Sequence, residues 1–409
     1  MRDHSMGVPN NAGWPEESLQ SLCKVISRGT APSYVDASPV LAIGQRCVQH
    51  SGFDASAARP HDKRFKRVLS ASPGDVLLNS TGTGTIGRSC VFDQPGDFMV
   101  DSHVTVLRGD RAKVDPRWVE ALLRSQWGQK HLESHCYTGS TNQIELSRNE
   151  LLRTNVLMPP IEEQGQIADI LDTVDTYVDA SNKLIAKLSH LGIALQDHLF
   201  ESQEWPTVRL DEICRITSGT TPLRAEGEKY FTSKGVPWVK TLDLNESTVI
   251  DTNEKVTPEA IRALKLRILP PGTVLVAMYG GWEQIGRTAL LGVSATINQA
   301  ICALEADDRL LPEFLLRVLQ QRRGQWRKMA ASTRKDPNIT KSDVHAFQVP
   351  MPPIQNQEYI VKSYASHLGR VANEIRSKNR LEIFKQGLMN DLLTGRVRVS
   401  EAEAVLEEL

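Results

Sequence analysis

Two segments of the chain place apolar residues at the spacing of a long amphipathic helix. Between residues 163 and 200, apolar residues fill the a and d positions of successive heptads, with Ser181 and Gly192 as weak positions and no proline inside. A similar stripe follows residue 353. The stripes consist of Ile167, Leu171, Val174, Val178, Ile185, Leu188, Leu195 and Leu199 in the first segment, and of Ile360, Tyr364, Leu368, Val371, Ile375, Leu381, Phe384 and Leu388 in the second.

A helix that carries such a stripe would leave it in water if it stood alone. The simplest way to bury both stripes is to pair the two helices as an antiparallel coiled coil. The first segment would then form a rod about 57 Å long, at a rise of ~1.5 Å per residue. An ordinary core helix within a globular domain is the alternative interpretation, but the length of both segments favours the coiled coil.

The sequence before each long helix contains the short apolar runs of β-strands. Val76–Leu78 and Val274–Val276 each follow a Pro-Gly turn, and Val104–Leu107 has the same β-rich character. Helices are expected to begin at Pro116 and Pro312, because proline is favoured at the first helical position. Each half of the chain is therefore predicted to hold a mixed α/β domain.

Several motifs occur twice, in the same order. Met158–Gln164 (MPPIEEQ) returns 193 residues later as Met351–Gln357 (MPPIQNQ), and Trp14-Pro15 returns 191 residues later as Trp205-Pro206. Solenoid repeats are only about 20–50 residues long, so this period indicates a duplicated domain together with its helix. Further pairs are Arg28–Pro32 with Ser218–Pro222, Pro73–Leu78 with Pro271–Val276, and Ile86–Arg88 with Ile285–Arg287.

The duplication predicts two similar α/β domains separated by two long helices. The expected boundaries are 1–160 for the first domain, 161–202 for the first helix, 203–352 for the second domain, 353–396 for the second helix and 397–409 for an acidic C-terminal tail. A molecule with two similar halves suits a target that itself has two halves.

The composition is that of an ordinary soluble protein. The net charge is -1, so any nucleic-acid-binding surface must be local. No apolar run reaches the ~18 residues of a membrane span. The six cysteines are scattered without a Cys-x-x-Cys pair, which argues against a zinc site and for reduced thiols. We therefore expect a cytoplasmic protein with no metal site and no membrane association.

Two glycine-rich stretches come close to the phosphate-binding P-loop but depart from it. Gly82–Ser89 and Gly281–Thr288 carry Arg88 and Arg287 where that motif has lysine. Both run into strand-like residues, whereas a P-loop opens a helix. We interpret each stretch as a glycine-rich loop whose arginine projects towards a partner. A structural turn with a solvated arginine is the alternative.

Basic residues gather locally although the chain as a whole is nearly neutral. They crowd the stretch Arg59–Arg67, and seven of them, with Trp326 among them and no acidic residue, lie between Arg317 and Lys335. Such residues supply phosphate contacts, although a run of charge is also typical of a solvated face. Acidic residues are concentrated instead in the first long helix and the C-terminal tail. This asymmetry suits domains that contact DNA and helices that contact protein.

Base reading needs side chains that reach base edges, such as arginine on guanine and asparagine or glutamine on adenine. The candidate DNA-binding residues therefore combine the basic clusters with polar, loop-like positions. They are Lys63, Arg64, Lys66, Arg67, Thr83, Arg88, Ser140, Thr141, Asn142 and Gln143 in the first half, and Thr220, Trp282, Gln284, Arg287, Arg327, Lys328, Arg334, Lys335 and Asn338 in the second.

No catalytic constellation stands out. His131 and His135 could share a helical face beside Cys136, but we interpret them as ordinary histidines rather than metal ligands. The sequence contains neither a Gly-x-Ser-x-Gly elbow nor the Asn/Asp-Pro-Pro-aromatic motif of a methyltransferase. We expect no catalytic residue and no cofactor in this chain. A bilobed enzyme with an active site between its lobes, and a coiled-coil scaffold that binds only proteins, are the alternative hypotheses.

Several of these motifs, taken together, resemble those of a known family. Trp205–Leu210, Ser218–Pro222 and Val236–Val239 are similar to the opening of a target recognition domain. Met158–Gln164 resembles the junction that begins a spacer helix, and Leu388–Val397 resembles the end of the second such helix. Their order over nearly the whole chain resembles the specificity subunit of Type I restriction-modification systems.

The resemblance implies two target recognition domains, each of which reads one half of a split, asymmetric double-stranded DNA target. It also implies that the helix pair fixes the separation of the half-sites and docks two methyltransferase subunits, which carry S-adenosylmethionine and methylate adenine. Restriction subunits, with ATP and magnesium, would join the complex, and this chain would be non-catalytic. The first copy departs further from the family pattern, with Arg28 and Ala31 where the second has Ser218 and Thr221. Its helix also lacks the Thr-Gly-Arg-Val ending.

Overall fold

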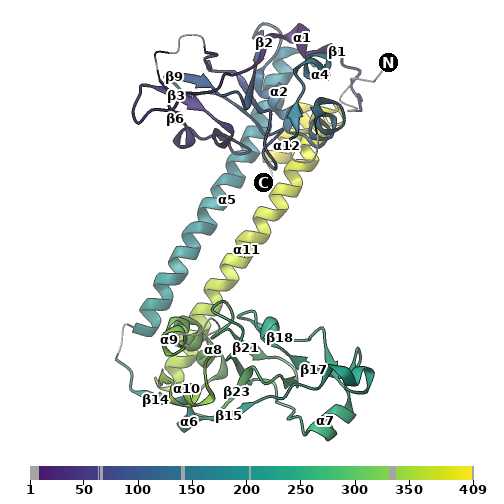
Figure 1. Ribbon diagram of the computed structural model, residues 1–409. Coiled ribbons are helices and arrows are strands. Elements are labelled where there is room, and N and C mark those ends of the chain that lie inside the picture. Colours follow the sequence, from purple (N-terminus) through teal and green to yellow (C-terminus); the bar gives the residue numbers. More distant parts are fainter. Residues whose placement is uncertain are drawn as a thin grey trace. The chain divides into compact units, whose positions relative to one another are not determined.

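The computed structural model describes residues 9–62, 64, 68–139, 143–201, 204–330 and 338–407 (Figure 1). It divides into two compact units: Met1–Ile185 with Glu374–Leu409, and Ala186–Asn373. We call residues 9–160 the first lobe and residues 204–353 the second lobe. No helix in the described ranges combines the length and the apolar character that a bilayer crossing needs.

The first lobe is built on a four-stranded antiparallel sheet. Its strand order is β2 (Cys23–Arg28), β10 (Val104–Gly109), β7 (Val76–Asn79) and β8 (Ser89–Val91). The central strands β7 and β10 are almost entirely buried, as their continuous apolar runs require. The strands predicted at residues 76–78 and 104–107 are therefore confirmed.

The second lobe repeats this sheet in the same order and adds a strand at its edge. The order is β15 (Cys214–Ser218), β23 (Ile301–Ala306), β20 (Val274–Ala277), β21 (Thr288–Leu291) and the additional β18 (Thr248–Val249). The duplication predicted from the sequence is confirmed at the level of strand order and register.

Each lobe also has a smaller sheet. In the first lobe, β9 (Asp97–Val100) pairs with β3 (Val40–Ile43), which pairs with β6 (Arg59–Pro60). In the second lobe the order is β16 (Phe231–Thr232), β19 (Lys255–Val256), β17 (Val236–Val239) and β22 (Thr296–Ile297).

The main helices of the lobes begin at the predicted prolines. Helix α2 (Pro116–Arg124) is capped by the Asp115 side chain and buries Trp118, Leu122 and Leu123. Its counterpart α8 (Pro312–Gln321) buries Phe314, Leu315, Val318 and Leu319. Shorter helices follow both, namely α3 (Gln126–His131) and α4 (Arg148–Arg153) in the first lobe and α9 (Arg323–Met329) and α10 (Lys341–Ala346) in the second.

Short elements complete each lobe. Those of the first are β1 (Glu16–Ser18), α1 (Leu19–Leu22), η1 (Gln45–Cys47), β4 (Val48–Gln49), β5 (Gly52–Phe53), η2 (Ala55–Ala57), η3 (Leu132–Cys136), β11 (Tyr137–Thr138), β12 (Glu145–Leu146) and β13 (Asn155–Leu157). Those of the second are β14 (Thr207–Arg209), α6 (Leu210–Ile213), η4 (Arg224–Lys229), η5 (Thr241–Asp243), α7 (Pro258–Leu264) and β24 (Gln348–Pro350).

The long helices α5 (Ile161–Glu201) and α11 (Ile354–Leu393) run antiparallel (Figure 1). In the first unit the ammonium of Lys385 on α11 pairs with the carboxylate of Asp175 on α5. In the second unit Gly192 of α5 lies against His367 of α11, whose Nε2 is 2.7 Å from the position a Cβ on that glycine would take. Residue numbers therefore rise along one helix as they fall along the other, as predicted.

The apolar stripes of these helices are buried to different degrees along their length. At one end Ile167, Leu171, Val174 and Leu388 join the core of the first unit, and at the other Ile360 joins the core of the second. Leu188 is also buried. Half-buried positions are Val178, Ile185, Leu195, Leu199, Tyr364, Val371, Leu381 and Phe384.

Leu368 and Ile375 were predicted to be core positions of the coiled coil, and this is wrong. They are 38% and 41% exposed. Both lie in the middle of α11, and neither belongs to a core cluster of the described residues, so a narrow apolar stripe there stays partly exposed. The spacing of apolar residues predicts a helical face, but it does not show how completely that face is covered.

The acidic C-terminal tail contains a helix. Residues Val399–Glu407 form helix α12, and Val399 and Ala402 are buried in the core of the first unit. The N-terminal part of the same unit meets the end of α11, because the backbone N–H of Asn11 donates to the carbonyl of Thr394 at 2.9 Å.

Candidate nucleic-acid interface

Each lobe presents a glycine-rich loop at the end of its central strand. We call Gly82–Arg88 the first glycine loop and Gly281–Arg287 the second. In the first loop the N–H groups of Thr85 and Ile86 both donate to the carbonyl of Gly82. In the second loop Gln284 and Ile285 donate in the same way to Gly281. The two loops are thus one local structure built twice. Strands β8 and β21 follow them directly, which confirms the prediction that neither is a P-loop.

The first glycine loop and the two residues before it are held by two side chains and one backbone N–H from other segments. Gln45 of η1 donates through Nε2 to the carbonyl of Thr81 at 2.8 Å, and Gln129 of α3 donates to that of Gly87 at 2.9 Å. The N–H of Leu146, in β12, donates to the carbonyl of Ser80 at 2.8 Å. The loop and the β11–β12 hairpin therefore form one polar surface.

The second glycine loop rests on helix α9. The Arg323 guanidinium donates to the carbonyls of Glu283 at 2.7 Å and Ile285 at 3.3 Å, and it pairs with the carboxylate of Glu246 at 3.2 Å. Arg327 donates to the carbonyl of Trp282 at 3.2 Å. The loop is therefore fixed through its backbone by two arginines.

Gly286 lets the second loop approach α9 closely. Its φ is +70°, and a Cβ there would lie 2.5 Å from Cδ1 of the buried Trp326. Trp326 is in turn stacked on Phe347, with ring centroids 3.9 Å apart. Any other residue at this position would be strained and would collide with the ring, so the repeated Ile-Gly-Arg motif has a packing reason here.

Three candidates of the first lobe lie near its glycine loop. Thr83 is exposed at the loop tip, and Gln143 is exposed in the β11–β12 hairpin. Arg88 ends the loop and is half-buried. Arg28, which also lies at this edge of the sheet, donates to the Ser80 carbonyl at 3.2 Å and pairs with Glu145 at 3.0 Å.

The candidates of the second lobe are gathered at the equivalent sheet edge. Trp282, Gln284 and Arg287 belong to the glycine loop, and Arg327 contacts it. Asn338 is exposed next to Ile339, whose N–H donates to Met278 at the start of the loop. The remaining candidates are Thr220, exposed just after β15 at the same sheet edge, and Lys328, exposed on α9.

Arg64 lies apart from the glycine loop, after β6 of the small sheet. Its guanidinium bonds both oxygens of Asp62, and these hydrogen bonds lower the pKa of that carboxyl to about 2. The remaining candidates lie outside the described residues. These are Lys63, Lys66, Arg67, Ser140, Thr141, Asn142, Arg334 and Lys335.

The arginines of the glycine loops bend back onto their own loops instead of simply projecting outwards. Arg88 donates to the carbonyl of Gly84 at 2.8 Å and to the Gln49 side chain at 3.3 Å. The Nε of Arg287 donates to the carbonyl of Glu283 at 3.0 Å. A role in DNA binding for these two residues stays a prediction, and each would have to share or exchange these hydrogen bonds with a base or phosphate.

Sequence reasoning missed the residues that hold the loops. Gln45 and Gln129 are far from the first loop in sequence, and nothing in their surroundings marks them. Arg323 belongs to a basic run, and the sequence alone favours a phosphate contact for every member of that run. The absence of acidic residues from that run was the available signal, because such a run has to find its hydrogen-bond acceptors elsewhere, here among backbone carbonyls.

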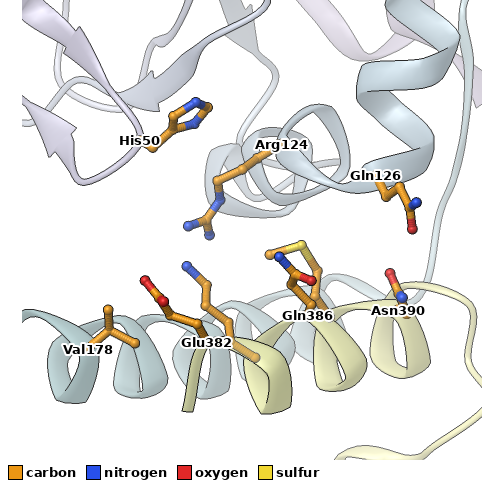
Figure 2. Close-up of a pocket in the computed structure, with 9 residues that line it drawn as sticks. His50, Arg124, Gln126, Val178, Glu382, Gln386 and Asn390 are labelled. Carbon is orange, nitrogen blue, oxygen red and sulfur yellow. The ribbon is translucent and has the colours of Figure 1, made fainter. Parts of the chain in front are cut away.

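A hollow of about 620 Å³ in the first unit lies between the lobe and the helix pair. Figure 2 shows Arg124 pointing from the lobe towards the helices, from which Glu382 points back, with His50 on the lobe side. Burial, with Arg88, Arg124 and Lys385 nearby, lowers the pKa of His50. A second cavity of about 310 Å³ shares His50 and Arg124 with it and is lined by more titratable groups, among them Glu120 and Asp175.

Ion pairs engage the charged groups beside this hollow. Asp175 of α5 accepts from Arg124 of α2 at 2.8 Å and from Lys385 of α11, and Arg124 also lies 3.3 Å from Glu120. Burial raises the pKa of Glu120, whose carboxylate accepts from Ser89 at 3.1 Å. Such a network suits a joint between the lobe and the helices better than proton transfer to a substrate.

The histidine pair of the sequence is packed inside the first lobe. His131 and His135 stack with ring centroids 4.7 Å apart, and His131 Nε2 is 3.1 Å from the hydroxyl of Thr154. Across the described residues, no group of three or more His, Cys, Asp or Glu side chains is arranged to hold a metal ion.

Comparison with known proteins gives the same family for both halves. The family model described as the Type I restriction modification DNA specificity domain matches residues 68–190 and 202–383. A named relative, the MjaX type I restriction enzyme specificity subunit of Methanocaldococcus jannaschii, is 22% identical over 349 residues, which are 80% of this chain and 79% of that protein.

Solved structures share the fold at low sequence identity. One of them comes from a study of complex assembly and conformational transition of the type I R-M system. It matches this chain with a TM-score of 0.65 at 17% sequence identity, and the match covers 95% of this chain and 99% of that one. The HsdS subunit from Thermoanaerobacter tengcongensis has a TM-score of 0.54 at 18% identity, with 95% and 98% covered.

Proposed function

This chain belongs to the Type I restriction modification DNA specificity family, and we propose that it binds a two-part, asymmetric double-stranded DNA target. The observation that carries the proposal is the repetition of one scaffold with unlike surface residues. The glycine loops share their turn geometry, yet Thr83 stands at the tip of one and Trp282 at the tip of the other. Two such lobes suit two different half-sites.

The glycine loops and the segments beside them are the proposed DNA-contacting surfaces. Polar side chains at the sheet edge would contact bases, as Asn, Gln and Arg do in DNA grooves. Exposed cations such as Lys328 and Arg64 would contact phosphates and set affinity rather than sequence preference.

The helix pair would fix the gap between the half-sites and dock the partner subunits. We expect two methyltransferase subunits, and restriction subunits with them, in the cytoplasm. S-adenosylmethionine, ATP and magnesium would be bound by those partners, and the chemistry would be theirs. The role proposed for this chain is non-catalytic.

The test is methylation mapping of the host genome with and without this chain. Adenine marks at a two-part motif that vanish on deletion are the expected result. Loss of the chain without any change in the marks would contradict the proposal. Binding to random duplexes by the chain with its methyltransferase partner gives a second measurement, and affinity should fall steeply with salt. Salt-insensitive binding would favour a protein-only scaffold, and turnover by the isolated chain would favour an enzyme.

A further inference from the structure

The second glycine loop exposes a large aromatic side chain at its tip. Trp282 is 44% exposed, in a chain whose largest fully buried side chains include three other tryptophans, Trp118, Trp238 and Trp326. The equivalent position of the first loop is Thr83, because the matching turn hydrogen bonds pair Thr85 with Gln284 and Ile86 with Ile285. The two lobes thus present unlike side chains from the same backbone position.

The loop that carries Trp282 is rigidly supported. Arg327 bonds the carbonyl of Trp282 itself, and Arg323 bonds the carbonyls of the next residue and of Ile285. Ile285 is completely buried, and Gly286 packs on the Trp326 ring. Because the loop backbone is already fixed, the exposed tryptophan can make an apolar contact with little loss of conformational entropy.

Cationic residues lie on this loop and on the helix that supports it. Lys328 is exposed on α9 one residue after Arg327, and Arg287 ends the loop. Glu283 is the acidic neighbour, and it too is exposed. In duplex DNA the thymine methyl group in the major groove is the apolar part of a base that a side chain can contact, and nearby cations can hold the phosphate backbone at the same time.

We infer that Trp282 is a specificity-determining residue of the second lobe, which contacts the apolar surface of a base, and that Arg323 and Arg327 position it through the loop backbone. This inference rests on the proposed DNA-binding function. It differs from the interpretation of the basic run as phosphate contacts, because it assigns two of its arginines to the loop and leaves Lys328 for the phosphates.

The first test exchanges the tip residues in the full chain with its methyltransferase partner. Trp282→Thr should relax the preference at one or two positions of one half-site and weaken binding to the native target by roughly ten- to a hundred-fold. The other half-site should be unchanged. Thr83→Trp, the matched control, should alter only the opposite half-site. Selection from random duplexes measures both.

The second test separates positioning from phosphate contact. Arg323→Ala should broaden base preference while the slope of log affinity against log salt stays as in the wild type. Lys328→Gln should weaken binding to all sequences alike and reduce that slope by about one. Arg323→Lys, which keeps the charge but not the forked donors, should behave like Arg323→Ala. Thermal unfolding of each variant shows that the lobe is still folded.

The outcomes are distinct. If Trp282→Thr leaves both half-sites and the affinity unaltered, the role of Trp282 is refuted. If Arg323→Ala lowers the salt slope by about one and keeps the base preference, Arg323 is a phosphate contact and the positioning role is refuted. If the wild-type complex selects no two-part motif at all, the proposed function itself fails, whatever the variants do.

Discussion

The side-chain amide of Gln164 links the start of helix α5 to the backbone of Asp115, because its Oε1 accepts the Asp115 N–H at 2.9 Å. Its Nε2 donates to the carbonyl of Pro159 at 2.8 Å. In the second unit Gln357 accepts from Leu311 at 2.8 Å and donates to Pro352 at 2.9 Å. The last residue of the repeated Met-Pro-Pro motif therefore fixes the angle at which each long helix leaves its lobe.

Replacing either glutamine should destabilise its own unit. Gln164 is 1% exposed and Gln357 is 0% exposed, and Gln164→Leu or Gln357→Leu leaves a partly buried backbone N–H, of Asp115 or Leu311, without its acceptor. The expected cost is about 1–3 kcal/mol in the free energy of unfolding. Denaturant unfolding measures it, with Glu162→Ala on the exposed face of the same turn as the control. Equal stability of the glutamine variants and the control would contradict this role.

Asp175 is predicted to be the most sensitive residue of the joint between the first lobe and the helix pair. Asp175→Asn removes the charge shared by Arg124 and Lys385. It should cost roughly 2 kcal/mol, between the values for exposed and buried ion pairs, because Asp175 is about a third exposed.

Asp179→Asn, one turn further along α5 and exposed, is the matched control for this change and should cost less than about 0.5 kcal/mol. The free energy of unfolding is measured for both variants at low and at high salt. Salt should screen the effect of the surface charge at Asp179, whereas the loss caused by Asp175→Asn should largely persist. If the loss of stability in Asp175→Asn disappears in 1 M salt, Asp175 does not link the first lobe to the helix pair in the way predicted.

Glu254 should make the second lobe sensitive to acid. Its pKa is lowered from 4.5 to about 2, chiefly by hydrogen bonds from Arg224. Burial raises the pKa, and a hydrogen bond from Lys240 lowers it further. A depressed pKa contributes stability that is fully present above the unfolded value and is lost as the pH falls towards 2. The wild type should therefore lose more stability than Glu254→Gln between about pH 5 and pH 2, by roughly 1 kcal/mol after solvent screening.

Denaturant titrations at several pH values measure this difference. Glu259→Gln, at an exposed position in α7, serves as the control and should follow the wild type. Parallel pH profiles for the wild type and Glu254→Gln would show that the Arg224 pair contributes nothing.

The sequence was informative wherever one residue type determines a local structure. The prolines at 116 and 312 predicted the starts of α2 and α8, and the repeated motifs predicted a duplicated fold. It failed where the partner of a residue lies far along the chain. The absence of acidic residues around Arg323 indicates that its acceptors lie elsewhere, but nothing in the sequence identifies them as the carbonyls of Glu283 and Ile285.

The helix stripes show the same limit. The heptad spacing correctly predicted two long antiparallel helices, but it predicted Leu368 and Ile375 to be as buried as Ile360. The difference arises because Ile360 packs into the core of the second unit, whereas Leu368 and Ile375 belong to none of the core clusters in the described residues. Candidate DNA contacts are still less accessible to sequence reasoning, since they depend on the unlike loops and on the shape of the DNA.

The register of the helix pair gives a quantitative prediction for the gap between half-sites. The contacts of Asp175 with Lys385 and of Gly192 with His367 place the heptad 182–188 opposite 372–378.

Deleting both heptads together shortens each helix by about 10 Å at ~1.5 Å per residue. Since DNA rises about 3.4 Å per base pair, the selected target should lose about three base pairs between its half-sites, with both half-sites unaltered. Deletion of 182–188 alone keeps the heptad phase but leaves α5 about 10 Å shorter than α11, so this control should impair folding or binding instead. Selection from random duplexes measures the gap directly. An unchanged gap after the paired deletion, or altered half-site sequences, would show that the helices do not set the spacing.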